Sequence, residues 1–242
     1  MKKWIYRILM VICLCVFGFS AYQLWTIYST KEEVKKETEA YKEIVMEDDS
    51  FKPDWTSLQE KNSDIIAWLY IPGCGINFPI VQGTDNEYYL QHTVEGNYNT
   101  MGSVFMDYNA HSDFSDDNSI IYGHSVEGGG MVTDLKKFAD QQFFNEHPYF
   151  YILTPEQNYK CDVWLFSKTQ DSSDTYITSF GDFKEESLQK MQQLALYENP
   201  MTVDAPLVSI STCDLDYGFH SDRRLVLTAI MHPTDQPIVV EG

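Results

Sequence analysis

The chain has 242 residues, and its charge divides it into two unequal parts. It carries 17 lysines and arginines against 36 aspartates and glutamates, a net charge of −19. Three of the basic residues and none of the acids precede Ser29, which leaves the remainder at −22. So acidic a surface repels phosphates, which argues against nucleic acid or an anionic membrane surface as a partner. Roughly 180 residues follow the first helical stretch, enough for one domain with its own core.

The N-terminus carries an uncharged run from residue 8 to residue 28, preceded by two lysines and an arginine. About 20 apolar residues span a bilayer, and a basic tail predicts a cytoplasmic N-terminus. The alternative is a cleaved signal peptide, with Gly18 and Ser20 near the cut, but the run exceeds the usual ~7–15 residues. We therefore predict a cytoplasmic tail over 1–7, a signal anchor over 8–28 and a catalytic domain outside the cell.

Two helices are expected between the anchor and the main domain. Residues 30–46 are charged with sparse apolar positions, which is typical of a helix that continues outward from the membrane. Residues 47–53 interrupt it. Asp54 is a plausible N-cap for a second helix over 55–62, which would pack Trp55 and Leu58 on the following domain. Together these segments predict a helical extension over 29–62.

From residue 65 the pattern changes to short β runs separated by turns, with two helical segments among them. The helical segments are 132–139 and 184–197, the second with apolar residues at helical spacing. Many β runs with few helices favour a single, mainly β barrel over a parallel α/β sheet, here over 63–242. The expected strands number about eight: 66–71, 78–82, 103–106, 119–122, 149–154, 159–166, 207–212 and 225–231.

Five cysteines do not form a disulfide framework. Cys13 and Cys15 lie in the apolar run, which leaves the odd number of three outside: Cys74, Cys161 and Cys213. A bridge between Cys74 and Cys161 stays open, although Cys161 lies in a predicted strand. Since no pair has Cys-x-x-Cys spacing, zinc and thioredoxin-type chemistry have no local support.

Three residues at strand ends could form a catalytic set. Cys213 lies where the apolar run 207–212 ends, and His124 follows another run through Gly123, whose missing side chain allows close approach. Arg224 begins the next strand. A thiol, an imidazole and a guanidinium facing one cleft suit acyl transfer through a thioester. Taken alone, a cysteine such as Cys213 is more often a buried residue that packs as a small hydrophobe, and a histidine such as His124 is more often a hydrogen-bonded residue at a strand end.

Neighbouring residues supply the alternatives. Arg223 and Arg224 face opposite sides of a strand, so only one of them can face the cleft of Cys213, and a surface ion pair with Asp222 or Asp216 suits Arg223 better. A metal centre from His111, Asp113 and His124, or from His220 and Asp222, lacks ligand spacing, so we expect no metal and no other cofactor. The histidines other than His124 lie in polar segments and are expected to be exposed: His92, His111, His147, His220 and His232.

The motifs together resemble the class B sortases, membrane-anchored cysteine transpeptidases of Gram-positive bacteria. The resemblance covers residues 55–231 and depends on the combination, since no single piece is specific. It implies a sortase-type barrel of about eight strands with N-terminal helices and an extra helix before the cysteine strand. The matching segments are Ile-Pro-Gly at 71–73, Phe-Pro-Ile-Val-Gln-Gly at 78–83, Asp-Asn-Glu-Tyr-Tyr-Leu at 85–90, Ile-Tyr-Gly-His at 121–124, Leu-Lys-Lys-Phe at 135–138, Ser-Ile-Ser-Thr-Cys at 209–213 and Arg-Leu-Val-Leu at 224–227.

The resemblance also implies roles for individual residues. Cys213 would be the nucleophile, His124 the general acid and base, and Arg224 the group that stabilises the oxyanion or holds the substrate threonine, with Arg223 a minority choice. A second set resembles contacts to the sorting signal: Asn86, Leu90, Tyr176, Ile177 and Ser211. Cys74 stands where the family is expected to have another residue, and it receives no role.

The implied reaction cleaves an Asn-Pro-x-Thr-type sorting signal near the C-terminus of a secreted protein. The acyl group would pass through a thioester to an amine of a peptidoglycan cross-bridge. One alternative is a sortase that polymerises pilins, which differs in the amine it accepts. Another is an inactive, membrane-tethered binding module on the same barrel, against which the intact Cys/His/Arg set argues.

Overall fold

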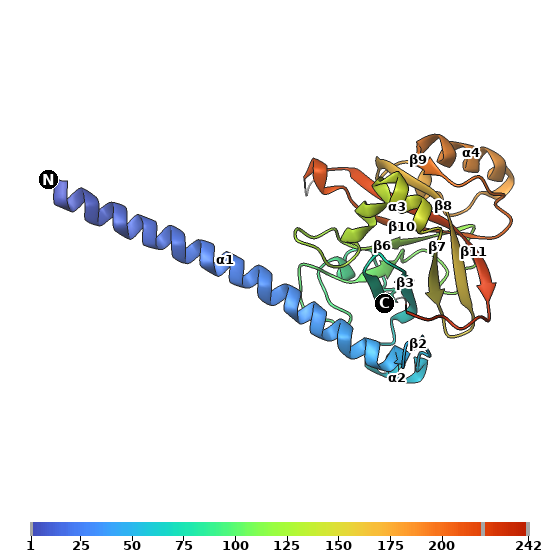
Figure 1. Cartoon of the computed structure of the whole chain (residues 1–242), viewed down its shortest axis with the longest axis horizontal. Coiled ribbons are helices and arrows are strands. Elements are labelled where there is room, and N and C mark those ends of the chain that lie inside the picture. The colour runs from blue at the N-terminus through green and yellow to red at the C-terminus, as the bar shows by residue number, and fades with distance from the viewer. Residues whose placement is uncertain (1, 219–220, 241–242) are drawn as a thin grey trace.

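In the computed structural model of the chain, residues 2–218 and 221–240 are described. A long helix leads into a β-barrel with smaller helices on its outside (Figure 1). The α-helices are α1 (Lys2–Val45), α2 (Trp55–Lys61), α3 (Gln141–Glu146) and α4 (Lys184–Leu194). The 3₁₀ helices are η1 (Tyr88–Leu90), η2 (Thr133–Ala139), η3 (Asp174–Tyr176), η4 (Gly181–Phe183) and η5 (Leu215–Tyr217).

The strands form one small hairpin and one large sheet that closes on itself. The hairpin is β1 (Met46–Glu47) with β2 (Ser50–Phe51). The large sheet contains β3 (Ile65–Ile71), β4 (Ile76–Val81), β5 (Val104–Met106), β6 (Asn118–Tyr122), β7 (Tyr149–Leu153), β8 (Asn158–Gln170), β9 (Ala195–Glu198), β10 (Leu207–Cys213) and β11 (Arg223–Thr234).

Eight of these strands make the barrel. Their order is β11-β10-β6-β5-β4-β3-β7-β8, and the pairing of β8 with β11 closes the ring. Two pairs, β6 with β10 and β4 with β5, are parallel, and the other neighbours are antiparallel. The closed, mainly β barrel of eight strands expected from the sequence is therefore confirmed. The ninth strand, β9, pairs with β8 alone.

Helices α1 and α2 cover the outside of β3, which is why that strand is apolar on both faces. Successive strand residues point to opposite sides. Leu69 belongs to the core inside the barrel, whereas Trp68 and Tyr70 pack outside it with Tyr41 of α1 and Leu58 of α2. The predicted cap of α2 is confirmed, because the Asp54 carboxylate accepts a hydrogen bond from the Ser57 N–H.

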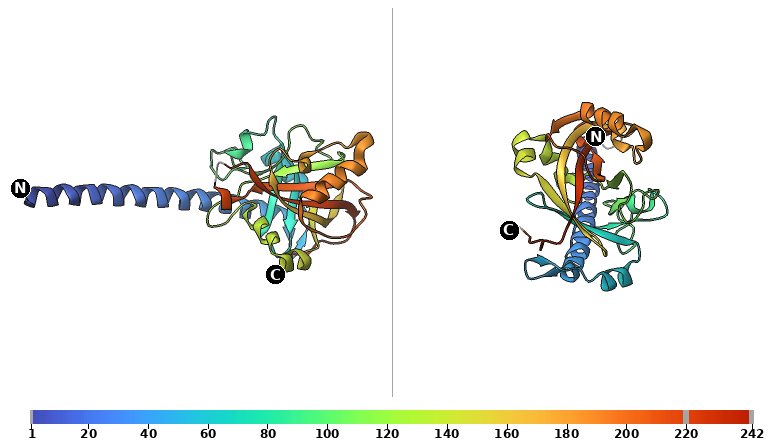
Figure 2. Two further views of the ribbon diagram at one scale, coloured as in Figure 1. Left: turned by 90° about the horizontal axis from the view of Figure 1, so that it is seen from above. Right: turned by 90° about the vertical axis from the view of Figure 1, so that its right-hand side faces the viewer.

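Helix α1 has two parts with different surroundings. Its first part projects away from the barrel and is long and apolar enough to cross a membrane by length and composition (Figure 2). The second part lies on the barrel through a buried stripe at helical spacing, formed by Val34, Thr38, Tyr41 and Val45. The helix runs unbroken through both parts, so the position of its free end is set by how its second part packs.

One predicted helix is shorter than its pattern suggested. The segment 184–197 was expected to be helical throughout, but α4 ends at Leu194 and β9 follows. Tyr197 pairs with Phe166 on the edge of β8, and burial alternates along β9. Backbone pairing with an open strand edge outweighs helix propensity here. Helix α3, which the sequence analysis did not predict, is capped by Asp140, whose carboxylate accepts from the Phe143 N–H.

Candidate active site

The parallel pairing of β6 with β10 brings His124 and Cys213 to the same edge of the barrel. Cys213 is the last residue of β10, and His124 lies two residues beyond the end of β6. The ladder continues past β6, since the Gly123 N–H donates to the Ser211 carbonyl at 3.2 Å. A Cβ on Gly123 would stand 2.8 Å from Val132 Cγ2, so the expected close approach at this glycine is confirmed.

Thr212 fixes the segment that carries His124. Its hydroxyl donates to the Gly123 carbonyl at 2.8 Å and lies 2.9 Å from the Ser125 hydroxyl. Both bonds are buried, which makes them costly to break. His124 therefore lies between two residues, Gly123 and Ser125, that are both hydrogen-bonded to Thr212, the neighbour of Cys213.

Arg224 lies directly opposite Cys213 in the antiparallel pair of β10 and β11. Opposed residues of such a pair have their side chains on the same face of the sheet. The Arg224 guanidinium donates to Asp171 Oδ2 at 3.0 Å and to the carbonyls of Ser221 and Arg223 at 2.7 and 3.0 Å. These bonds to described residues engage three of the five N–H donors of an arginine, so up to two can serve a substrate.

Arg223 is more exposed and has other neighbours. Its guanidinium lies over the Tyr217 ring at 5.4 Å, and its Nε is 4.0 Å from Asp222 Oδ1. The two arginines therefore differ as strand alternation predicts. Arg224 lines the cleft of Cys213, and Arg223 does not line it.

A hydrogen bond to a backbone carbonyl decides which nitrogen of His124 is free. His124 Nε2 lies 2.8 Å from the Leu90 carbonyl oxygen, at the end of η1. A carbonyl oxygen can only accept, so Nε2 carries the proton in this bond. Nδ1 is then the nitrogen that can take up or release a proton in a reaction.

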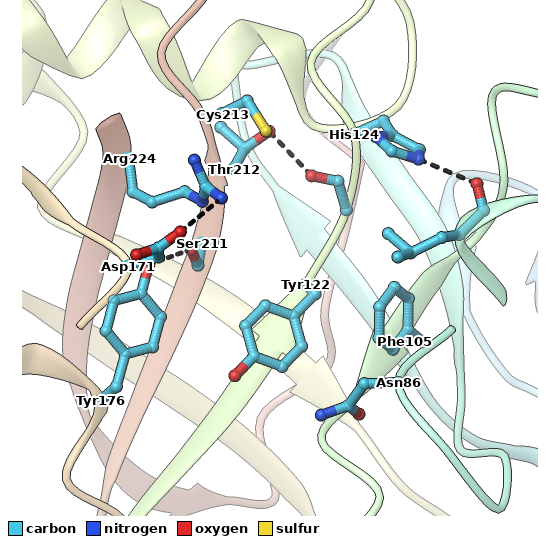
Figure 3. A pocket seen from close by; sticks show the side chains of 12 residues that line it. Asn86, Phe105, Tyr122, His124, Asp171, Tyr176, Ser211, Thr212, Cys213 and Arg224 are labelled. Atoms are coloured by element: carbon cyan, nitrogen blue, oxygen red, sulfur yellow. Dashed lines mark hydrogen bonds and ion pairs between the residues drawn. The ribbon is translucent and has the colours of Figure 1, made fainter. Parts of the chain in front are cut away.

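These groups line one cleft of about 310 Å³ (Figure 3). Of the second set predicted from the sequence, four residues line it as well: Asn86, Leu90, Tyr176 and Ser211. The Tyr176 hydroxyl is 2.6 Å from the Ser211 hydroxyl, and burial raises the pKa of Tyr176 to about 12. Tyr176 therefore stays a neutral hydrogen-bonding group at physiological pH.

The side chain of Asn86 is held in place by hydrogen bonds to Asp107 and Tyr108. Its amide donates to Asp107 Oδ2 at 2.9 Å, and its carbonyl oxygen accepts from the Tyr108 N–H at 3.0 Å. Tyr122 donates to the same Asp107 oxygen at 3.2 Å. One half-buried carboxylate thus orients two side chains that reach the cleft, Asn86 from the loop between β4 and η1 and Tyr122 from the end of β6.

Ile177 is the predicted contact residue that lies elsewhere. It is absent from the lining of the cleft and packs instead with the apolar cluster of Phe180 and Met191 under α4. The backbone turns from η3 into an extended conformation at Ile177. Tyr176 and Ile177 consequently point to different sides, which adjacency in the sequence could not show.

Sequence reasoning missed several residues that line the cleft: Phe105, Tyr122, Asp171 and Thr212. Tyr122 had a usable signal, because it stands two positions before His124 along the same run. Asp171 had none. It follows β8, far from Arg224 in sequence, and the pairing of β8 with β11 brings the two together.

The remaining cysteines outside α1 are buried and unpaired. Cys74 and Cys161 are both free, so the bridge that the sequence left open is not formed. Burial raises the pKa of Cys74 to about 12 and raises the pKa of Cys161 well above its usual range. Since the thiolate is the reactive form, neither residue can compete with Cys213 as a nucleophile.

The expectation that the other histidines are simply exposed was wrong for several of them. His232 lies on β11 between Asp162 and Asp204, at 2.9 and 3.1 Å. His147 stacks on Phe143 with ring centroids 3.7 Å apart. His92 is half-buried, His111 is exposed but bonds to Asp116, and His220 lies outside the described residues.

Comparison with known proteins agrees with this fold. No family model matches the chain. It is 35% identical over 176 residues to sortase B of Listeria monocytogenes, which covers 70% of each chain. Sortase B of Bacillus anthracis is 31% identical with a TM-score of 0.74, over 86% of this chain and all of that one. A class B sortase of Streptococcus pyogenes involved in pilus biogenesis is 33% identical with a TM-score of 0.66, over 74% and 98%.

The closed eight-stranded barrel and these relatives define the protein as a sortase, a cysteine transpeptidase. More narrowly, the chain belongs to the class B sortases.

Proposed function

We propose that the protein cleaves an Asn-Pro-x-Thr-type sorting signal and transfers the new C-terminus to an amine of a peptidoglycan cross-bridge. The observation that supports this most directly is the register of β10 with β11, because it sets Cys213 opposite Arg224 beside His124 in one cleft. The sorting signal would lie along Asn86, Leu90, Tyr176 and Ser211.

The reaction has two steps, formation of the thioester and its attack by an amine, and the same three residues act in both. The Cys213 thiolate attacks the threonyl carbonyl, the C–N bond breaks, and His124 gives its proton to the leaving amine. His124 then takes a proton from the incoming amine as that amine attacks the thioester, and the C–S bond breaks. Arg224 offers its remaining donors to the oxyanion in both steps.

We further propose that residues 8–28 anchor the enzyme in the cell membrane, with residues 1–7 in the cytoplasm and the barrel outside. The support is the apolar first part of α1, which makes no buried contact with the barrel. Residues 29–62 form a helical extension that carries the catalytic domain, residues 63–242.

Cleavage of a fluorogenic Asn-Pro-x-Thr peptide tests the reaction. The full-length protein in vesicles should release the fluorophore, and mass spectrometry of the quenched enzyme should find the acyl group on the peptide that contains Cys213. An acyl group on another residue, or no cleavage at all, would contradict the proposal. N-terminal sequencing that found a mature N-terminus near Ala21 would show that the apolar run belongs to a cleaved signal peptide and is not an anchor.

The pilus-forming relative of Streptococcus pyogenes keeps a second function open. A pilin lysine would then replace the cross-bridge amine. Offering both amines to the same thioester and measuring which product forms separates the two functions.

A further inference from the structure

Asp171 lines the cleft of Cys213 beside Arg224 and has no part in the reaction described above. It is the first residue after β8, and its N–H donates to the Asp222 carbonyl at 3.0 Å. Its carboxylate accepts a hydrogen bond from Arg224 Nη2 at 3.0 Å (Figure 3). An ion pair at the edge of the cleft therefore ties the arginine of β11 to the end of β8.

The acceptors around Arg224 leave a defined part of its guanidinium free. Nη1 donates to the carbonyls of Ser221 and Arg223, which uses both of its N–H groups. Nη2 donates once, to Asp171. The two carbonyls belong to the segment that carries the arginine, so they fix the guanidinium relative to its own loop. Among the described residues, Asp171 is the acceptor that fixes it relative to another strand, and Nε–H and the second N–H of Nη2 can then serve a substrate.

Asp171 acts on Arg224 in two opposite ways. Its negative charge offsets part of the positive charge that stabilises an oxyanion, which slows the reaction. Its hydrogen bond holds the guanidinium in place before the reaction begins, which speeds the reaction. The Asp171 side chain is 48% exposed, so water screens its charge. A displacement of about 1 Å costs on the order of 10²-fold in rate, so the effect on position is the larger one.

We propose that Asp171 is a positioning residue for the transpeptidation, and that it acts through Arg224. It holds the guanidinium so that the two remaining N–H donors meet the oxyanion of the threonyl carbonyl. This inference rests on the function proposed above. Asp171 takes up no proton and forms no covalent bond in either step, so its effect is confined to the steps in which an oxyanion develops.

The test measures acylation of Cys213 in single turnovers, with the full-length enzyme in vesicles and the fluorogenic Asn-Pro-x-Thr peptide. A single-turnover rate constant does not depend on the amount of folded enzyme. Asp171→Ala should lower the rate constant at saturating peptide by about tenfold or more. The half-saturating peptide concentration should not change, because the oxyanion exists only in the transition state. Asp171→Asn should fall between this variant and the wild type, because a neutral amide oxygen accepts a weaker hydrogen bond than a carboxylate does.

Asp222→Asn is the matched control. It removes the same charge from an exposed carboxylate that is bonded to Gln170 and lies near Arg223, and its rate constant should be that of the wild type. The decisive comparison is Asp171→Ala made in the Arg224→Ala variant. No further loss of rate should follow there, because the arginine that Asp171 holds is already gone. A general structural defect would lower the rate in both backgrounds.

A second measurement needs no substrate. Arg224 is one of three arginines in the chain, with Arg7 and Arg223. Full-length protein with isotope-labelled arginine in detergent micelles therefore gives few guanidinium signals in an NMR spectrum, and Arg223→Lys assigns them. Rotation about the Nε–Cζ bond exchanges Nη1 with Nη2. For Arg224 this exchange should be faster in Asp171→Ala than in the wild type, and unchanged in Asp222→Asn.

Three kinetic results would overturn the positioning role: a wild-type rate constant in Asp171→Ala, an equal loss in both backgrounds, or an Asp171→Asn variant faster than the wild type. The last would mean that the charge of Asp171 outweighs its hold on the guanidinium. Equal exchange rates for Arg224 with and without the Asp171 carboxylate would overturn it as well. A wild-type enzyme that does not cleave the peptide is a different result, which refutes the proposed sorting signal, and the exchange measurement then still decides whether Asp171 holds Arg224.

Discussion

A cysteine at the end of a barrel strand and a cysteine in the middle of one have opposite environments. Cys213 ends β10, is partly exposed and lines a cleft, whereas Cys161 lies within β8 and is completely buried. Burial raises the pKa of Cys161 well above its usual range. The barrel interior makes a thiol inert, and the strand end leaves it available for chemistry.

The same contrast extends to what surrounds each cysteine. Cys161 belongs to the apolar core, with Phe150 opposite it on β7. Cys213 has Arg224 opposite it and shares its cleft with His124. If this comparison is right, substitutions at the strand ends should change rate, and a substitution in the middle should change stability.

The largest expected effect is at the nucleophile. Cys213→Ala should abolish both peptide cleavage and transfer, because no other group in the cleft can form the thioester. The fold should be kept, since the side chain is at the barrel edge. Circular dichroism checks the fold, and a peptide-cleavage assay checks the activity. Cleavage at the wild-type rate would show that Cys213 is not the nucleophile.

His124→Ala should come next. Loss of general acid and base catalysis alone costs roughly 10²–10⁴-fold in rate. In His124→Gln the side-chain amide could keep the hydrogen bond to the Leu90 carbonyl, but an amide cannot act as a general acid and base. This variant should therefore be as slow as His124→Ala. Single-turnover measurements of acylation check this, and a rescued rate would mean that His124 only supports the loop.

The two arginines sharpen the comparison within one strand. Arg224→Ala should lower kcat by about 10²–10³, the usual cost of losing an oxyanion donor. Arg223→Ala should be nearly normal in rate, because it removes a surface contact worth under about 1 kcal/mol. Steady-state kinetics of both variants, with their melting temperatures, check this. The reverse ranking would move the role to Arg223.

The smallest effect is expected at Cys161. Cys161→Ala should keep the specific activity and lower stability by about 1 kcal/mol at pH 7, as small core truncations do. The folded pKa of this thiol is raised, so the wild-type protein loses stability as pH rises above the unfolded value. Each pH unit above about 8.5 removes up to about 1.4 kcal/mol from the wild type and none of it from the variant. Urea denaturation at pH 7 and pH 10 should therefore show the difference shrinking or reversing, and a constant difference would contradict the burial argument.

The sequence was sufficient for the elements with strong local patterns. The eight barrel strands follow from short apolar runs bounded by turn residues, and α2 follows from Asp54 before an apolar turn. That Cys213, His124 and Arg224 lie in one cleft could be expected, because each stands at an end of such a run. Local pattern failed at Ala195–Glu198, where the open edge of β8 decided the conformation.

What only the tertiary structure decided are the contacts between segments distant in sequence. The bond of Arg224 to Asp171, the bond of His124 to the Leu90 carbonyl and the direction of Ile177 all depend on how strands and loops meet after the barrel closes. Residue type and periodicity determine which segments form strands and which side chains can react, because those are local properties. Which side chains meet is fixed by the closure of the sheet, and a single sequence carries no local signal for it.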